Sequence, residues 1–291
     1  MASTREIRRR IQAVKNVAQI TRAVQMVASS KMRRAQERVL AARPYSEQLA
    51  KLLSRLSKQA EGQEDLPLMR SREVRSAAII VITPDRGLAG ALSSNVNRRA
   101  IQLAIELRRE HGADLAISFI AVGRKGRDFL MRTRRKLLAE FTRLGDQPQQ
   151  VDVRAIARTV TDAYLGEEVD LVYLVYPKFV STILQTPTVN QLLPVRPPDE
   201  ERESGPAPQY IFEPDATTIL GELLSRYLET LIYQPLLETV ASFYSAQMVA
   251  MRNATDNATD LLGDLTLTYN KARQAAITNQ ILEIVSGANV S

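Results

Sequence analysis

The sequence has 291 residues, 45% of them hydrophobic and 24% charged, with a formal net charge of +7, which allows one core plus an extended element or two domains. Cysteine is absent and His111 is the single histidine, which excludes disulfides, thiolate metal sites and a cysteine nucleophile and leaves little for histidine-based catalysis. No apolar stretch approaches the ~20 residues needed to cross a bilayer and no secretory signal is present, so we expect a soluble, cytoplasmic chain.

The chain begins with a long helical pattern, which we expect to cover residues 1–60. No Pro or Gly occurs before Pro44, where a kink is possible. Small and apolar residues recur every 3.5 positions on average, the spacing that keeps one helix face turned toward a partner in a left-handed coiled coil. This line comprises Ile7, Ile11, Val14, Ala18, Thr21, Val24, Ala28, Met32, Ala35, Val39 and Ala42.

The same helix carries the excess positive charge. Residues 1–43 contain eleven Lys and Arg residues against two Glu residues. A basic helix can bind nucleic acid, an anionic membrane surface or an acidic protein, and a solvated face of a coiled coil is the simplest alternative. Aromatic residues for base stacking are missing from the first 44 positions, which favours an acidic protein partner over nucleic acid.

The middle of the chain, residues 70–195, alternates strand and helix patterns. Four short apolar segments have the character of buried parallel strands: 76–83, 115–122, 137–143 and 170–176. Helical patterns lie between them, at 95–110, from about 125, and at 152–164. This alternation predicts a Rossmann-like, doubly wound α/β domain, to which segments 179–184 and 188–195 add an antiparallel ribbon.

The turn at residues 84–90 follows a strand and precedes a helix, which is where nucleotide-binding loops occur. Gly87 and Gly90 fit neither the dinucleotide fingerprint nor the phosphate loop, and we expect them to serve tight backbone turns. No convergent set of acids, bases or nucleophiles points to an active site elsewhere. The sequence therefore predicts no catalytic, cofactor or metal site.

A linker and a second long helix complete the chain. Residues 196–210 are rich in Pro and charge and predict a linker, and residues 211–291 predict a helix that Pro235 kinks or restarts. Its line of small and apolar residues again advances 3.5 positions per step. The line comprises Val240, Phe243, Gln247, Ala250, Ala254, Ala258, Leu261, Leu265, Thr268, Ala272, Ala275, Asn279 and Leu282.

The two terminal helices are expected to pair as an antiparallel coiled coil. If residues near 60 lie beside residues near 215, Ile7 lies opposite residue 268, and the rest of the second helix has no helix of its own chain to pack on. This overhang carries apolar side chains that each cost on the order of 1.5 to 3 kcal/mol to leave in water. Another protein should therefore cover Ile277, Ile281, Leu282, Ile284 and Val285.

Four segments carry a specific family resemblance: 3–45 (STREIRRR to AARPY), 85–96 (DRGLAGALSSNV), 174–194 (LVYPKFVSTILQTPTVNQLLP) and 248–288. They resemble the gamma subunit of the F-type ATP synthase. The resemblance implies that the terminal helices enter a ring of alternating alpha and beta subunits, and that the α/β domain is a foot near the epsilon subunit and the c-ring. It also implies a non-catalytic rotor that couples proton-driven rotation to ATP synthesis in the beta subunits.

The resemblance implies contact residues as well. They are Lys31, Arg33 and Arg34 in a basic neck that faces acidic loops of beta, and Arg273, Gln274, Thr278, Ile281, Leu282 and Val285 at the shaft tip inside the ring. Val24, Pro235 and the pair Asn279 and Gln280 depart from the family pattern. The absence of cysteine favours a bacterial form, attached to the cytoplasmic face of the plasma membrane only through the complex.

Two other classes of function remain open on the sequence. One is a coiled-coil protein that binds nucleic acid through the basic helix. The other is a nucleotide-dependent enzyme built on the α/β domain.

Overall fold

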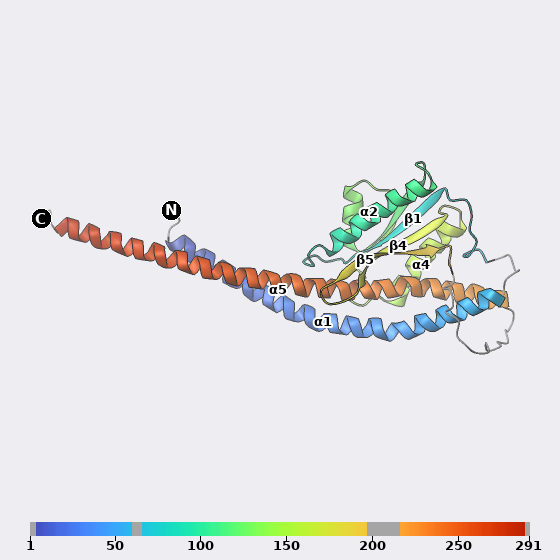
Figure 1. Cartoon of the computed structure of the whole chain (residues 1–291), viewed down its shortest axis with the longest axis horizontal. Coiled ribbons are helices and arrows are strands. Elements are labelled where there is room, and N and C mark those ends of the chain that lie inside the picture. Colours follow the sequence, from blue (N-terminus) through green and yellow to red (C-terminus); the bar gives the residue numbers. More distant parts are fainter. Residues whose placement is uncertain (1–3, 60–65, 197–215, 289–291) are drawn as a thin grey trace. The chain divides into compact units, whose positions relative to one another are not determined.

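The computed structural model describes residues 4–59, 66–196 and 216–288 (Figure 1). Contacts divide the chain into two units: the helix-pair unit, Met1–Ser29 with Gln247–Ser291, and the sheet unit, Ser30–Ala246. Helix α1 (Thr4–Gln59) and helix α5 (Ala216–Ala288) contribute to both units. The expected linker falls outside the described residues except for Arg196, as do residues 60 and 211–215.

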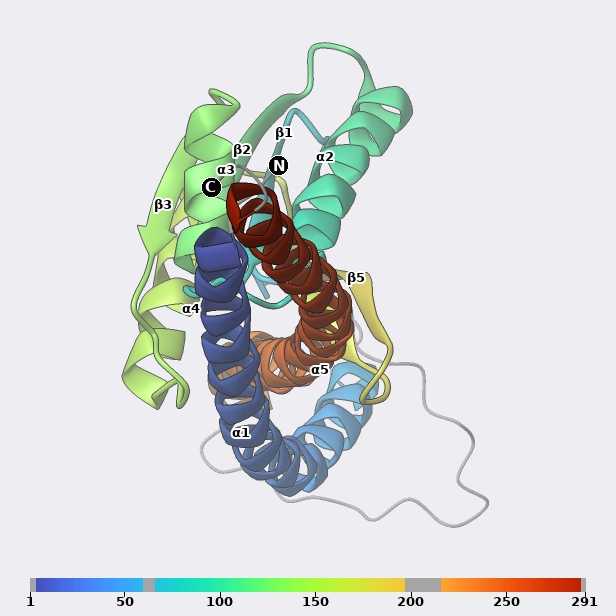
Figure 2. The same ribbon diagram turned by 90° about the vertical axis from the view of Figure 1, so that its left-hand side faces the viewer.

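In the helix-pair unit the two helices lie side by side (Figure 2), as the sequence predicts. The predicted line of α1 is confirmed, because each of its members is buried or partly buried. On α5 the inward positions are Met251, Ala254, Thr255, Ala258, Leu262, Leu265, Tyr269 and Ala272. The predicted Leu261 is 47% exposed, and four more predicted members are exposed too: Thr268, Ala275, Asn279 and Leu282. A mean spacing of 3.5 residues arises when spacings of three and four residues alternate, and either spacing can come first. The sequence prediction placed them in the wrong order for this helix.

The sheet unit contains a five-stranded sheet of β1 (Ser76–Ile82), β2 (Ala116–Val122), β3 (Leu137–Phe141), β4 (Leu171–Phe179) and β5 (Gln185–Leu193). The strand order is β3-β2-β1-β4-β5, with every neighbouring pair parallel except β4 and β5. The predicted ribbon is therefore present, but its first segment is wrong. Residues 180–184 form the turn between β4 and β5, which the backbone hydrogen bond from Val180 N to Leu184 O closes.

Helices cover both faces of this sheet. On one face α2 (Leu92–His111) and α3 (Arg124–Arg132) pack against alternate residues of β1, including Ile79 and Val81. On the other face α4 (Gln150–Leu165) packs with the parts of α1 and α5 that belong to this unit, against a set that includes Ile80 and Ile82. Apolar side chains on both faces explain why the strands have continuous apolar sequences.

Neither proline breaks a long helix. Pro44 and Pro235 lie inside α1 and α5, so of the two alternatives at Pro235, a kink or a restart, the continuous helix excludes the restart. A proline removes one backbone hydrogen bond, but here Ile232, Leu236 and Leu237 around it are all buried in the sheet unit. Tertiary packing of this face outweighs the local cost.

None of the helices in the described ranges has the length and apolar character of a membrane span.

Candidate partner-binding surfaces

The register of the helix-pair unit agrees with the sequence prediction. Arg8 donates a hydrogen bond from Nη2 to the hydroxyl of Tyr269, and its guanidinium lies 5.4 Å from the centre of that ring. The sequence placed Ile7 opposite residue 268. Among the α5 side chains that the structure describes, the last one that is even partly buried belongs to Ala272, so the described packing against α1 ends there.

Beyond Ala272 every described side chain of α5 is exposed, from Arg273 to Leu282. We name this segment the tip (Figure 1). Its predicted contact residues Arg273, Gln274 and Thr278 lie on this helix surface, and the Thr278 hydroxyl donates to the Gln274 carbonyl at 3.0 Å. Ile277, Ile281 and Leu282 are 43%, 55% and 58% exposed. The side chain of Val285 lies outside the described residues.

The predicted basic neck contains side chains in different situations. Arg33 and Arg34 are exposed, and Arg33 lies 3.6 Å from Glu37 in an ion pair of the kind that contributes little to stability. Lys31 is half-buried, and its Nζ donates to Asp146 Oδ2 at 2.6 Å and to the Tyr244 hydroxyl at 3.3 Å. The charge of Lys31 is therefore already paired within the chain, which the sequence analysis did not foresee.

Asp146 is the partner of Lys31 that the sequence did not reveal. Besides Lys31 it binds Arg86, whose Nη2 donates to Oδ1, and its backbone carbonyl accepts from Arg38 Nη1 at 3.2 Å. Burial raises the pKa of the Asp146 carboxyl, but the hydrogen bonds from Lys31 and Tyr244 and the charge of Arg86 outweigh it, so the pKa is lowered. The hydrogen bond to Asp146 raises the pKa of Lys31. Both groups are therefore charged at neutral pH.

The turn at residues 84–90 contacts two other segments of the sheet unit. Arg86 projects to Asp146, while Asp85 Oδ1 accepts from the backbone N–H of Arg124 at 2.9 Å at the start of α3. Gly90 has a φ of +56°, as expected for a glycine that a turn requires. Gly87 does not have a left-handed conformation, so its backbone angles do not by themselves require a glycine.

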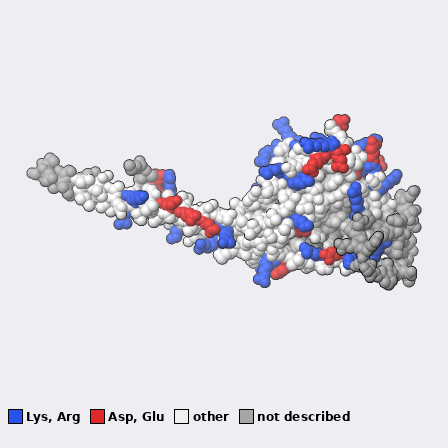
Figure 3. Space-filling model, viewed as in Figure 1, with Lys and Arg blue, Asp and Glu red and all other residues white. Residues whose placement is uncertain are grey.

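The helix-pair unit also has an acidic surface that the sequence analysis did not describe. The exposed acids of α5 there, Asp256, Asp260 and Asp264, recur every fourth residue and therefore share one helix face. Figure 3 shows a stripe of acidic atoms along the helix pair, with basic atoms on either side of it. The surface of this unit is thus of mixed charge, although the sequence of α1 alone is strongly basic.

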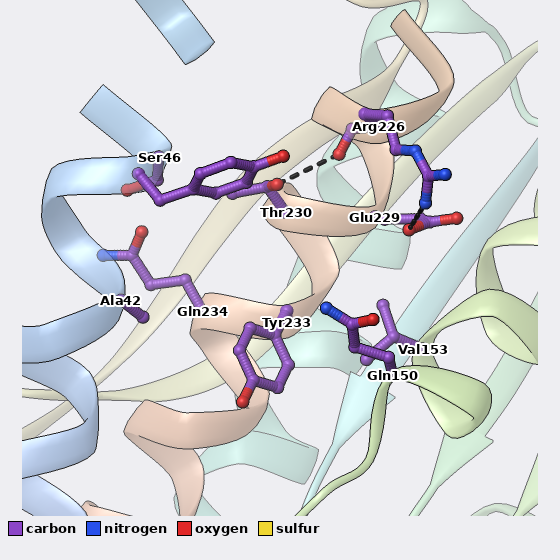
Figure 4. A pocket seen from close by; sticks show the side chains of 10 residues that line it. Ala42, Ser46, Gln150, Val153, Arg226, Glu229, Thr230, Tyr233 and Gln234 are labelled. Carbon is purple, nitrogen blue, oxygen red and sulfur yellow. Dashed lines mark hydrogen bonds and ion pairs between the residues drawn. The ribbon is translucent and has the colours of Figure 1, made fainter. Parts of the chain in front are cut away.

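A cavity of about 390 Å³ lies in the sheet unit between α1, α4 and α5 (Figure 4). Its charged groups are paired, since Glu229 lies 3.3 Å from Arg226 and 3.7 Å from Arg154. The Thr230 hydroxyl donates to the Arg226 carbonyl at 3.0 Å. The two charged side chains that line the cavity, Arg226 and Glu229, therefore pair with each other. Across the described residues, no three His, Cys, Asp or Glu side chains come together in a way that could hold a metal ion.

Comparison with known proteins gives a consistent result along the whole chain. The family described as ATP synthase matches residues 3–290. A protein of Roseiflexus sp. (strain RS-1) named "ATP synthase gamma chain" is 50% identical over 99% of this chain and 98% of its own length. A protein of the same name from Dehalococcoides mccartyi (strain CBDB1) is 47% identical over 99% of both chains.

Solved structures share the fold. A chain of the Euglena gracilis mitochondrial ATP synthase (OSCP/F1/c-ring, rotational state 3) is similar with a TM-score of 0.64 and 18% identity, over 99% of this chain and 94% of that one. A chain of the Tetrahymena thermophila mitochondrial ATP synthase (central stalk/cring) has a TM-score of 0.60 and 24% identity, over 81% and 99%. These matches give no support to the nucleic-acid-binding interpretation. The chain belongs to the ATP synthase gamma-chain family.

Proposed function

We propose that the chain is the central rotor shaft of an F-type ATP synthase, which couples proton-driven rotation of the c-ring to ATP synthesis in the beta subunits. The observation that carries this proposal is the tip of α5, a helix segment with exposed apolar side chains beyond the end of its packing against α1. Leaving these side chains in water is unfavourable, so an enclosing partner stabilises them. A ring of alternating alpha and beta subunits is such a partner.

The proposed mechanism follows from asymmetry. One pair of unlike helices cannot present the same face to three beta subunits, so each beta subunit meets a different surface and adopts a different conformation and nucleotide affinity. Rotation of the shaft exchanges these states. The beta subunits supply the chemistry, and this chain is not an enzyme.

The proposed contacts with the ring are of two kinds. At the tip, Arg273, Gln274 and Thr278 offer polar groups beside apolar Ile281, Leu282 and Val285. In the neck, the exposed Arg33 and Arg34 face acidic loops of beta, while Lys31 contributes less because Asp146 already pairs with it. The sheet unit binds the epsilon subunit and the c-ring. The shaft lies at the cytoplasmic face of a bacterial plasma membrane and is held there only through the complex.

Reconstitution tests the function. Alpha and beta subunits of the same complex are assembled with and without this chain, and ATP hydrolysis is measured together with rotation of a bead attached to the sheet unit. We expect the chain alone to hydrolyse no ATP, and the assembly that contains it to turn over faster and to rotate. Equal turnover with and without the chain, or turnover without rotation, would refute the rotor function.

A further inference from the structure

Asp146 joins parts of the sheet unit that are distant in the sequence. It lies in the segment after β3 and directly follows Gly145, whose φ of +72° is in the left-handed region that favours glycine. Its carboxylate binds Lys31 of α1 and Arg86 of the turn after β1, and its backbone carbonyl binds Arg38 of α1. Lys31 in turn contacts α5, where its Nζ lies 5.3 Å from the ring centre of Tyr244.

The opposite edge of the sheet is tied to α5. Strands β3 and β5 are the two edge strands, and the turn before β5 is held by Ser245, whose Oγ donates to the Thr182 carbonyl at 2.6 Å. Ser242 Oγ donates to the Pro177 carbonyl of β4 at 2.8 Å. The sheet is therefore attached near one edge to α1 through Asp146 and near the other edge to α5 through two serine hydroxyls.

Two attachments at opposite edges resist twisting better than one, because a force couple needs two separated points of action. On the α1 side the attachment consists of charge-assisted hydrogen bonds that converge on one carboxylate. Such bonds are shorter and stronger than neutral ones, and partial burial protects them from screening by salt. The Asp146 side chain is 30% exposed and that of Lys31 is 37% exposed.

We propose that Asp146 is a positioning residue that carries torque between the sheet and α1. This inference rests on the proposed rotor function. Without the carboxylate α1 keeps its apolar packing on the sheet, but the edge near β3 loses its charged attachment and slips more easily relative to α1 under load, so part of each rotation is not transmitted. The turn DRGLAG takes part through Arg86, which gives this family motif a mechanical role.

The test uses the complete complex in proteoliposomes with Asp146→Asn, which keeps the side-chain shape and removes the charge. The readout is the ratio of protons pumped to ATP hydrolysed against an opposing proton gradient. We expect the ratio to fall by up to about threefold, because losing one partly exposed ion pair makes slip of this edge under load easier by roughly that factor. The matched control is Asp162→Asn, which makes the same charge change at an exposed pair with Arg158 on α4 and should leave the ratio unchanged.

A second variant separates transmission of torque from simple loss of stability. Lys31→Met removes the main partner of Asp146. The double variant Lys31→Met with Asp146→Asn should have the same ratio of protons pumped to ATP hydrolysed as Asp146→Asn alone, because both substitutions break the same attachment. An unchanged ratio in Asp146→Asn overturns the proposal, and so does an equal fall of pumping and hydrolysis that leaves the ratio constant. If the wild-type chain itself fails to couple hydrolysis to pumping, the rotor function is refuted instead.

Discussion

The hydroxyl oxygens of Thr21 and Thr255 lie 2.7 Å apart across the buried contact between α1 and α5 in the helix-pair unit. The Thr21 hydroxyl oxygen also lies 3.2 Å from the Ala18 carbonyl oxygen, and the Thr255 hydroxyl oxygen lies 2.9 Å from the Met251 carbonyl oxygen. Each hydroxyl therefore has a hydrogen-bond partner in its own helix as well. A slip of the helices by one turn would separate the two hydroxyls and lose the hydrogen bond between them, although each would keep the carbonyl of its own helix. This pair therefore specifies the register of the shaft, as single polar residues do in other coiled coils.

The first prediction concerns this pair. Thr255→Val keeps the side-chain shape but leaves the Thr21 hydroxyl without its partner across the helices, and we expect a loss of about 1 kcal/mol in the free energy of unfolding. The double variant Thr21→Val with Thr255→Val should be less destabilised than the two single changes added together. Thermal unfolding of the full chain measures this. Thr266→Val on the exposed face of α5 is the control, and strict additivity would contradict the prediction.

The second prediction concerns Glu238, a carboxyl that is 5% exposed in the sheet unit. Oε1 accepts from Gln234 at 3.4 Å, whereas Oε2 has no partner among the described residues. Burial raises the pKa of Glu238, against weaker opposing effects of the Phe179 backbone and of Lys178. The folded chain therefore holds the proton more tightly than the unfolded chain, and stability falls as pH rises through the interval between the two pKa values.

Above the ordinary carboxyl pKa the ionisable Glu238 therefore lowers the stability of the fold, and at pH 7 Glu238→Gln should raise the free energy of unfolding by about 1 kcal/mol. For a chain of this size the melting temperature should rise by roughly 2–4 °C at pH 7. Below the ordinary carboxyl pKa the wild-type side chain is protonated in both states, so the gain should vanish near pH 4. Glu222→Gln, on the exposed surface of the same helix, is the control. A gain that is independent of pH would show that ionisation is not the cause.

The third prediction concerns Gly123, which directly precedes α3 and has a φ of +96°. A Cβ at this position would lie 1.8 Å from the Thr83 carbonyl oxygen at the end of β1, which no side chain can tolerate. Gly123→Ala should therefore destabilise the chain by more than the roughly 1–3 kcal/mol of backbone strain alone. Gly112→Ala is the matched control, because Gly112 has a φ of +111° and open space around it. Equal losses in the two variants would contradict the clash.

Much of the fold could be predicted because its determinants are local. Continuous apolar runs identified the parallel strands, and the 3.5-residue spacing identified the face of α1 that meets α5. The face of α5 was harder, since Leu261 and Leu262 are both apolar and periodicity alone does not distinguish them. The interaction of Arg8 with Tyr269 decides the choice, and it joins residues at opposite ends of the chain.

The surfaces for partners were predicted less completely, for a physical reason. The sequence shows that α1 is rich in basic residues, but a basic side chain is available to a partner only where no acidic side chain of the same chain pairs with it. Lys31 and Asp146 are 115 positions apart, and no local pattern marks them as a pair. The tip was foreseen because its exposure depends only on the relative lengths of the two helices.

The fourth prediction uses the absence of cysteine from the sequence, which makes an introduced thiol unique. Ile281→Cys places the thiol at the tip, where the native side chain is 55% exposed, so a water-soluble maleimide should label it rapidly in the isolated chain. If the alpha and beta ring encloses the tip, labelling in the assembled complex should slow by at least about tenfold. A free-energy cost of about 1.4 kcal/mol for exposing the enclosed thiol to the reagent is enough for that change. Arg158→Cys on the exposed surface of α4 should react at the same rate in the assembly of this chain with the alpha and beta ring and in the isolated chain. Equal rates at Ile281→Cys before and after assembly would show that the apolar tip stays in solvent, and the ring could not then be the partner that stabilises it.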